Sequence, residues 1–397
     1  MSIFEAIKNG DKEEVQKIVD EALESETIQQ LFSETFDERR LSDASAEDED
    51  EDEKTALMLA AKIGNKEIVE ILLTAAQPLG LEKEIVEMKT LKGETALSFA
   101  VSKQNNSVID LLLQSVEPEV KNTILTNVDD YQFTPLVEAV MYGYHDVVKT
   151  LLQSVQGDPE TLLKLLSYAN SQGTTVLIYT TARQDDETAK QLVKMIVDSA
   201  LEEKLDIGKL LTAQDGTGKT FLMHVVAHNL ISTLNFILEY LKNDSETMKR
   251  LITCADHKGI TPLLQAAQGL PVYSIFRRGY ASNKLVHFIL KAVCDDENTT
   301  QQMLKHRGKS GESALSYAIQ YDYRYVTSRL IGAASTETLE SWRAEGMFNQ
   351  CLEKATSQSA RLEILGLFGE NSEQRAKRQR CEHEKEPAEE GRGLLFS

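Results

Sequence analysis

The chain has 397 residues, 41% of them hydrophobic, and a formal net charge of −20. A surface this acidic repels phosphate groups, which argues against nucleic acid and anionic membranes as partners and favours a protein partner, a basic one in particular. No run of about 18 apolar residues occurs, so we expect no membrane span.

The ends and the cysteines of the chain indicate its compartment. The N-terminal sequence MSIFEAIKNGDKEE is charged and amphipathic, unlike a Sec signal peptide. The cysteines are scattered and form no Cys-x-x-Cys motif, which argues against disulfides and zinc and favours a reducing compartment; they are Cys254, Cys294, Cys351 and Cys381. We therefore expect a soluble protein in the cytoplasm or the nucleus.

The first predicted elements form an N-terminal capping unit over residues 1–41. Ile3 to Val19 is a helix pair with a turn at Gly10-Asp11, and a third helix is expected from Ser25 to Phe36. Residues 42–53, SDASAEDEDEDE, follow as a predicted disordered loop, because clustered like charges cannot pack. The alternative function of this loop is to attract a basic partner.

A helix pair starting at Lys54 then recurs along the chain. In KTALMLAAKIGNKEIVEILLTAA, apolar residues lie at helical spacing on both sides of Gly64-Asn65, which supplies the turn. Six further copies follow at intervals of 39 to 52 residues, each starting at a hydroxyl residue; the anchors are Thr55, Thr95, Thr134, Thr175, Thr220, Thr261 and Ser313. A pair this small cannot bury its apolar faces alone, so stacked copies are expected.

These copies resemble the ankyrin-repeat family. Thr134-Pro135-Leu136 and Thr261-Pro262-Leu263-Leu264-Gln265-Ala266-Ala267 match its core motif best. Two features depart from the family: the usual His after Thr-Pro-Leu is absent from every copy, and the period is near 40 residues, where ankyrin units repeat about every 33. The resemblance implies a protein-binding scaffold that uses its concave face and inter-helix loops, with no cofactor and no catalysis.

The additional residues predict a third helix in each repeat. Asp158, Asp244 and Asp296 each precede an acidic first turn and a short amphipathic segment, which is typical of a capped helix. We therefore predict an all-α, ankyrin-like solenoid over residues 54–334, in which seven repeats of about 40 residues carry a short third helix in place of long β-hairpins. The expected core includes Leu57, Leu97, Leu136, Leu222, Leu263 and Leu315.

The C-terminal part changes in composition. Residues 335–369 predict capping helices, and residues 370–397 predict a disordered tail rich in Glu, Lys and Arg. The tail holds a basic cluster that resembles a nuclear import signal; its members are Arg375, Lys377, Arg378 and Arg380. The alternative is a solubilising tail whose basic residues are balanced by the glutamates that follow.

Motifs for catalysis and metal binding fail on inspection. Gly218-Lys219-Thr220 resembles the end of a phosphate-binding loop, but Ala213 stands where that motif needs Gly, and the segment is in phase with the other repeats. His224 and His228 lack the Glu of a His-Glu-x-x-His site. We expect no enzyme, no metal and no cofactor.

The candidate protein-binding site combines two aromatic and basic groups from neighbouring repeats. A predicted inserted loop near Pro271 to Ser282 carries the first group, and the seventh repeat carries the second; together they are Tyr273, Phe276, Arg277, Arg278, Tyr280, Tyr321, Tyr323, Arg324 and Tyr325. Tyr and Arg are the side chains that dominate protein interfaces. The alternative is that the loop packs back on its own repeat.

The predicted function is a non-catalytic interaction scaffold. The degenerate motifs are similar to those of ankyrin effectors from intracellular bacteria, which act in eukaryotic host cells after delivery by a route other than Sec. The alternatives are a eukaryotic cytosolic or nuclear adaptor and an enzyme with a site between repeats. The sequence leaves the partner and the oligomeric state open, with a monomer favoured.

Overall fold

The computed structural model describes residues 2–36, 54–182, 185–269 and 275–354, together with residues 365, 366 and 369. The side chains of Phe36, residues 275–280 and Lys354 are outside this description. The expected acidic loop at 42–53 and the tail at 370–397, with Arg375, Lys377, Arg378 and Arg380, also lie outside the described residues.

The chain forms two compact units. Unit 1 comprises Met1–Gln184 and Gln191–Ile207, and unit 2 comprises Asp185–Lys190 and Gly208–Ser397. Two helices are therefore divided between the units, α14 (Asp186–Glu202) and α15 (Ile207–Thr212).

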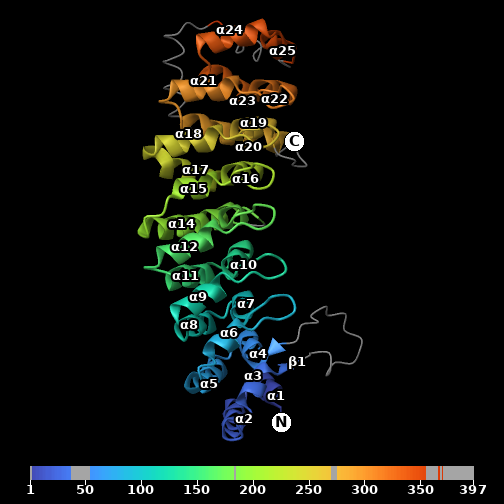
Figure 1. Ribbon diagram of the computed structural model, residues 1–397. Helices are drawn as coiled ribbons and strands as arrows, with labels where there is room; N and C mark the ends of the chain where they lie inside the picture. Colours follow the sequence, from blue (N-terminus) through green and yellow to red (C-terminus); the bar gives the residue numbers. More distant parts are fainter. Residues whose placement is uncertain are drawn as a thin grey trace. The chain divides into compact units, whose positions relative to one another are not determined.

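Unit 1 is a succession of helical repeats (Figure 1). The first helices of its repeats are α1 (Ile3–Asn9), α4 (Ala56–Ile63), α7 (Ala96–Ser102), α10 (Pro135–Tyr142) and α13 (Val176–Tyr179). The second helices are α2 (Lys12–Glu24), α5 (Lys66–Ala76), α8 (Asn106–Gln114), α11 (His145–Ser154) and the main part of α14. The third helices are α3 (Ile28–Ser33), α6 (Glu82–Glu87), α9 (Pro118–Leu125) and α12 (Pro159–Ser167), and a 3-10 turn, η2 (Gln77–Leu79), precedes α6.

Unit 2 repeats the same order of helices (Figure 1). Its first helices are α16 (Phe221–Ala227), α19 (Pro262–Gln268) and α22 (Ala314–Gln320), and its second helices are α17 (Ile231–Tyr240), α20 (Ile275–Lys291) and α23 (Arg324–Ala333). Its third helices are α18 (Ser245–Thr253), preceded by η3 (Leu241–Asn243), then α21 (Glu297–Lys305) and α24 (Thr336–Ala344), after which comes α25 (Met347–Lys354).

The hydroxyl anchors of the sequence are the N-caps of the first helices. Thr134, for example, accepts a hydrogen bond from the backbone N–H of Val137 at 3.2 Å, which satisfies one of the donors that a helix leaves open at its start. The same bond occurs at five other anchors. Thr220 is the exception, because its buried Oγ1 has no hydrogen-bond partner.

The predicted third helices are confirmed. Asp158, Asp244 and Asp296 each cap one of them, and each carboxylate accepts a 3.0 Å hydrogen bond from the N–H three residues later. The leucines expected in the core are also buried. The all-α prediction missed one small sheet, in which β1 (Thr35–Phe36) pairs antiparallel with β2 (Lys54–Thr55). The helix expected through Phe36 therefore ends at Ser33.

The inserted loop predicted near Pro271 to Ser282 is wrong over most of its length. From Ile275 onward the chain is helical and forms the first turns of α20, so the additional residues lengthen the second helix of this repeat. The stretch has no proline after Pro271, and one glycine, Gly279, is tolerated within a helix of 17 residues. Residues 270–274 lie outside the described residues.

Short turns of five residues precede the first helices, and we call them finger turns. The N–H of the first residue in each donates to the carbonyl of the fifth. They comprise residues 90–94, 129–133, 170–174, 215–219, 256–260 and 308–312. Within the units, three pairs of neighbouring finger turns are each joined by a backbone hydrogen bond, such as the one from the N–H of Asp130 to the carbonyl of Lys92 at 2.9 Å. These turns stand where long β-hairpins would otherwise lie.

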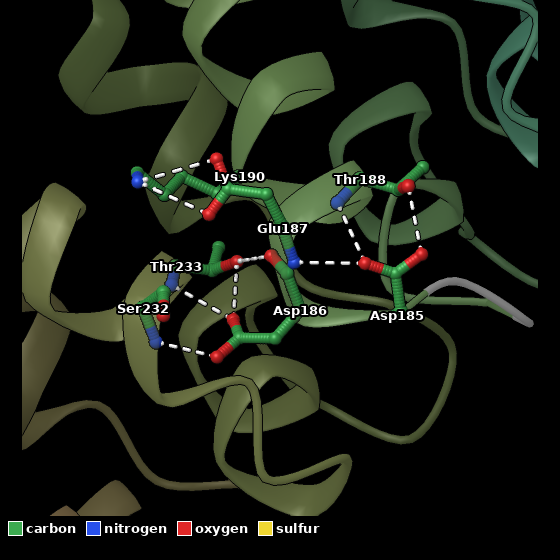
Figure 2. Close-up of polar contacts among 7 residues, drawn as sticks. All are labelled: Asp185, Asp186, Glu187, Thr188, Lys190, Ser232 and Thr233. Carbon is green, nitrogen blue, oxygen red and sulfur yellow. Dashed lines mark hydrogen bonds and ion pairs between the residues drawn. The ribbon is translucent and has the colours of Figure 1, made fainter.

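Polar side chains also join one repeat to the next. Figure 2 shows two neighbouring carboxylates in unit 2 that cap different helices. Asp185 accepts from the N–H of Thr188 in its own helix, whereas Asp186 accepts from the N–H groups of Ser232 at 2.7 Å and Thr233 at 3.0 Å. Asp186 therefore places a negative charge at the N-terminus of α17, where the helix dipole favours it.

Candidate functional site

In two repeats a hydrogen bond links the finger turn to the first helix that follows it. The first residue of the turn lies beside the helix residue nine positions later. In unit 1, the Asn170 Nδ2 donates to the Tyr179 Oη at 2.9 Å. In unit 2, the Asp215 Oδ2 and the His224 Nε2 are 2.8 Å apart. We call this position the slot of the repeat.

The slot of the repeat that begins with α10 holds two acids. Asp129 begins the finger turn, and Glu138 lies nine residues later on α10. Burial, and then the charges of Asp129 and Glu94, raise the pKa of Glu138 to about 8. Among the described residues, no hydrogen bond or ion pair reaches the Glu138 carboxylate. We call Glu94, Asp129 and Glu138 the acidic slot.

Glu94 reaches this slot because of a second regularity of the fold. The last residue of a finger turn lies against the first helix of the next repeat. Lys54, directly before α4, places its Nζ 5.4 Å from the centre of the Phe99 ring on α7. Phe133, the last residue of the finger turn 129–133, packs edge to face on Tyr179, with 5.7 Å between the ring centres. Glu94 occupies the equivalent position relative to Glu138, and its charge helps to raise the pKa of Glu138 after burial and the charge of Asp129.

Aromatic side chains surround the acidic slot. Burial first, and then nearby groups that include Asp129, raise the pKa of Tyr168 and Tyr179. Burial and then Glu138 raise the pKa of Tyr144, whose ring stacks on Tyr142 at 5.7 Å. The slot is therefore a half-buried acidic site with tyrosine side chains near its carboxyl groups.

The finger turns and the helix that form the slot also expose large apolar side chains. Leu91 is 85% exposed, Tyr131 is 65% exposed and Tyr142 is 47% exposed. We call the acidic slot and these three side chains the finger face of unit 1. Exposed apolar and aromatic groups around a polar centre are typical of an interaction surface.

Part of the chain matches a known protein family. Residues 3–124 and 79–161 match the family model described as ankyrin repeats in three copies. Residues 3–161 are therefore similar to ankyrin repeats. Ankyrin repeats are in general modules for protein–protein interaction.

Two solved ankyrin structures are similar to the chain at low identity. The ankyrin repeat domain of Bcl-3, described as a unique member of the IκB family, is 20% identical, with coverage of 66% of this chain and 93% of that one and a TM-score of 0.49. The ankyrin repeat protein EF0377 is 17% identical, with coverage of 58% and 94% and a TM-score of 0.41. No curated protein matches the chain.

The binding patch predicted from the sequence lies partly within the described residues of unit 2. Tyr321 and Tyr325 are 38% and 48% exposed, and Arg324 is also exposed. Tyr323 is buried, with its ring stacked on Tyr321 at 5.7 Å and lying against Gly269, so it does not contribute to the exposed part of this patch.

The other half of that patch is not described at the level of side chains. Tyr273 lies outside the described residues, and the backbone of residues 275–280 belongs to α20. The union of Phe276, Arg277, Arg278 and Tyr280 with Tyr321 and Tyr325 in one surface stays a prediction.

The segment that resembled a phosphate-binding loop is a finger turn. Asp215 accepts hydrogen bonds from Thr217 and Lys219 within residues 215–219, and α16 begins directly after Thr220. Burial would raise the pKa of Asp215, but hydrogen bonds from Thr217, His224 and Lys219 outweigh it and lower this pKa to about 2. In unit 2 the slot is thus a satisfied acid–base pair.

Neither a metal site nor a membrane helix is found in the described parts of the chain. No three His, Cys, Asp or Glu side chains there are arranged to hold a metal ion, the acidic slot included. Nor does this part of the chain contain a helix with the length and apolar character needed to cross a membrane.

Sequence reasoning missed the acidic slot. Each of its acids is unremarkable on its own, and the signal lies only in the comparison of repeats. When the repeats are aligned on their anchors, Glu138 falls at the position of Phe99, Tyr179, His224, Gln265 and Tyr317, and it is the acid in that column.

Proposed function

We propose that this protein is a non-catalytic ankyrin-repeat scaffold whose partner docks on the finger face of unit 1. A Lys or Arg side chain of that partner enters the acidic slot. The observation that carries the proposal is Glu138, a half-buried acid between two other acids, without a hydrogen bond or ion pair to any described residue.

The energetics of the slot favour a cationic ligand. An acid held among acids is destabilising for the free protein, and an incoming ammonium or guanidinium group supplies the missing countercharge. The aromatic side chains at the slot add cation–π attraction, and the exposed Leu91 and Tyr131 offer apolar contact around it. A basic segment of a protein also fits the overall charge of −20.

The test compares three forms of the protein as baits in a eukaryotic cell lysate: wild type, Glu138→Gln and Glu119→Gln. Glu119 is an exposed acid on the third helix α9, so its substitution makes the same Glu-to-Gln change away from the finger face. A partner that is lost with Glu138→Gln and retained with Glu119→Gln supports the proposal. Equal capture by all three forms would show that the partner binds outside the acidic slot. No capture by any form would argue against the scaffold function itself.

The exposed aromatic residues of unit 2 are proposed as a second contact surface. Tyr321 and Tyr325 flank the turn into α23, and stacking on the buried Tyr323 holds Tyr321 in place. Preformed aromatic side chains lose little conformational entropy on binding. Exchange of Tyr321 and Tyr325 for Ala should weaken the binding of a partner that uses this surface, whereas Tyr142→Ala in unit 1 should leave that binding unchanged.

The cellular setting remains part of the proposal. We place the protein in the cytoplasm of a eukaryotic cell, as a delivered bacterial effector or as an endogenous adaptor, with nuclear import through Arg375, Lys377, Arg378 and Arg380 as the rival location. A fluorescent fusion with and without these four basic residues distinguishes the two locations. Nuclear signal that depends on them would favour import.

A further inference from the structure

Unit 2 contains a groove on its second and third helices, away from the finger turns. It has a volume of about 450 Å³ and lies between α17, α18 and α20. Leu238 and Met248 are buried in its floor, and Phe288 is half-buried beside them. This volume is within the range of roughly 300–1,000 Å³ that is typical of ligand sites.

Unit 1 contains a groove at the equivalent place in its repeats. It has a volume of about 390 Å³ and lies between α11, α12 and α14. Its floor is Leu152, Leu162 and Met195. Leu152 and Leu162 occupy the same positions of their helices as Leu238 and Met248, and Met195 aligns with Phe288 when the buried apolar residues of α14 and α20 are matched. The apolar floors of the two grooves are thus alike.

The rims of the two grooves differ in charge. Lys249 and Lys291 stand in unit 2 where Leu163 and Asp198 stand in unit 1. Asp198 pairs with Lys194 at 3.2 Å. No hydrogen bond or ion pair joins the side-chain ammonium group of Lys249 or Lys291 to another described residue.

The acids on the rim of the unit 2 groove are already engaged. Asp296 caps α21 through the N–H of Thr299, Glu239 lies 3.9 Å from Lys242, and Asp295 accepts a hydrogen bond from the Cys294 thiol. Lys249 lies near enough to Asp296 to contribute to its lowered pKa, after the bonds from Thr299. The rim therefore presents two ammonium groups over an apolar floor, in a chain that is acidic overall.

We propose that this groove binds an acidic peptide segment of a partner protein, in which carboxylates flank large apolar side chains. The apolar side chains cover Leu238, Met248 and Phe288, and the carboxylates pair with Lys249 and Lys291. Charge complementarity selects this occupant, because an acidic segment is repelled by the rest of the surface and attracted at this rim. The site is independent of the acidic slot, which lies in unit 1 and takes the opposite charge.

The experiment uses the full chain and a fluorescent probe peptide with a Leu-Leu-Phe core between Glu residues. The matched control peptide has Gln in place of every Glu. Fluorescence anisotropy should show binding of the Glu peptide that weakens as salt is added, and binding of the Gln peptide about tenfold weaker or more. Equal binding of the two peptides would overturn the proposed charge selection.

Two reciprocal variants place the site. Lys249→Leu with Lys291→Asp gives the unit 2 groove the residues of unit 1, and should reduce affinity for the Glu peptide about tenfold or more. Leu163→Lys with Asp198→Lys gives the unit 1 groove a basic rim, and should add a second binding site. All four residues are exposed, so both variants should keep the helicity of the wild type. Unchanged affinity in the first variant would overturn the proposal.

The exposed Cys294 lines the groove, so its reactivity reports where the peptide binds without any substitution. Its alkylation rate, followed by peptide mass spectrometry, should fall when the Glu peptide is bound, while that of Cys254 should not. Binding without protection of Cys294 would place the peptide elsewhere and overturn the site.

One rival occupant comes from the chain itself, since Glu389-Glu390 and Leu394-Leu395-Phe396 have the same chemistry as the probe. If the probe binds only after those three apolar residues are changed to Ala, the tail is the occupant and the external partner is overturned.

Discussion

The slots of Glu138 in unit 1 and His224 in unit 2 are formed by the same backbone elements, but the pKa of an acid is raised in the first and lowered in the second. In each, a finger turn begins with Asp and the first helix presents an ionisable side chain nine residues later. In unit 2 the Asp215–His224 pair is closed at 2.8 Å, and the pKa of Asp215 is lowered to about 2. In unit 1 the pKa of Glu138 is raised to about 8.

The backbone of the repeat determines the position of the side chain in the slot. The residues around that side chain determine whether it stabilises or destabilises the fold. A satisfied slot contributes to folding, and an unsatisfied one is costly unless a ligand completes it. We therefore assign a structural role to the slot of Asp215 and a binding role to that of Glu138.

The largest expected effect is stabilisation by Glu138→Gln. The folded protein keeps this proton up to about pH 8, whereas the unfolded chain releases it near 4.5, so the stability of the wild type falls as pH rises between these values. At pH 9 the variant should be more stable by about 3 kcal/mol, and at pH 5 by less than about 1 kcal/mol. Denaturant unfolding at the two pH values measures this, and a gain that does not depend on pH would contradict the burial of a charge.

The reciprocal change in unit 2 should destabilise. Asp215→Asn removes a carboxylate whose pKa is lowered to about 2, so the stability that it contributes is present above about pH 4 and lost as pH falls from there through 2. At pH 7 we expect a loss of about 2 kcal/mol, which denaturant unfolding detects. If Asp215→Asn were neutral at pH 7, the two slots would not differ as we describe.

A transplant sharpens the comparison further. Glu138→His rebuilds the pair of unit 2 beside Asp129, and should stabilise the protein by about 1 kcal/mol at pH 6. Because the paired imidazolium raises the folded-state pKa of a histidine, this gain should be full at low pH and lost as pH rises through that pKa. The same variant should no longer capture the basic partner. Increased stability together with unchanged capture would contradict the binding role of Glu138.

The smallest effect concerns the anchors of the same two repeats. Thr134→Val removes an N-cap hydrogen bond and should cost about 1 kcal/mol. Thr220→Val removes a buried hydroxyl that has no partner, and should be neutral or stabilising by a few tenths of a kcal/mol. Thermal unfolding of both variants side by side provides the measurement. An equal loss in both would show that Thr220 caps its helix in solution.

Much of the fold could be predicted because its signals are local. The hydroxyl anchors and the caps Asp158, Asp244 and Asp296 act within four residues of themselves, and the apolar spacing identifies the buried leucines. The helical start of α20 and the β1–β2 pair were missed, because one depends on how a repeat accommodates additional residues and the other on pairing across residues 37–53.

The site was harder to predict because it is not local. Glu94 and Glu138 meet only when neighbouring repeats stack, and Tyr323 is buried by contacts that its own helix does not show. Aromatic and basic composition alone drew attention to Tyr321 and Tyr325, while an uncompensated acid gives no compositional signal.

The central claim is that Glu138 is held in an unsatisfied acidic site. The most direct test is a pH titration of its carboxyl carbon by NMR, with the signal assigned from its absence in Glu138→Gln. The account predicts a midpoint near about 8, and a lower midpoint once a basic ligand fills the slot. A midpoint near the ordinary value of 4.5 in the free protein would show that the slot is already solvated or paired, and would contradict the account.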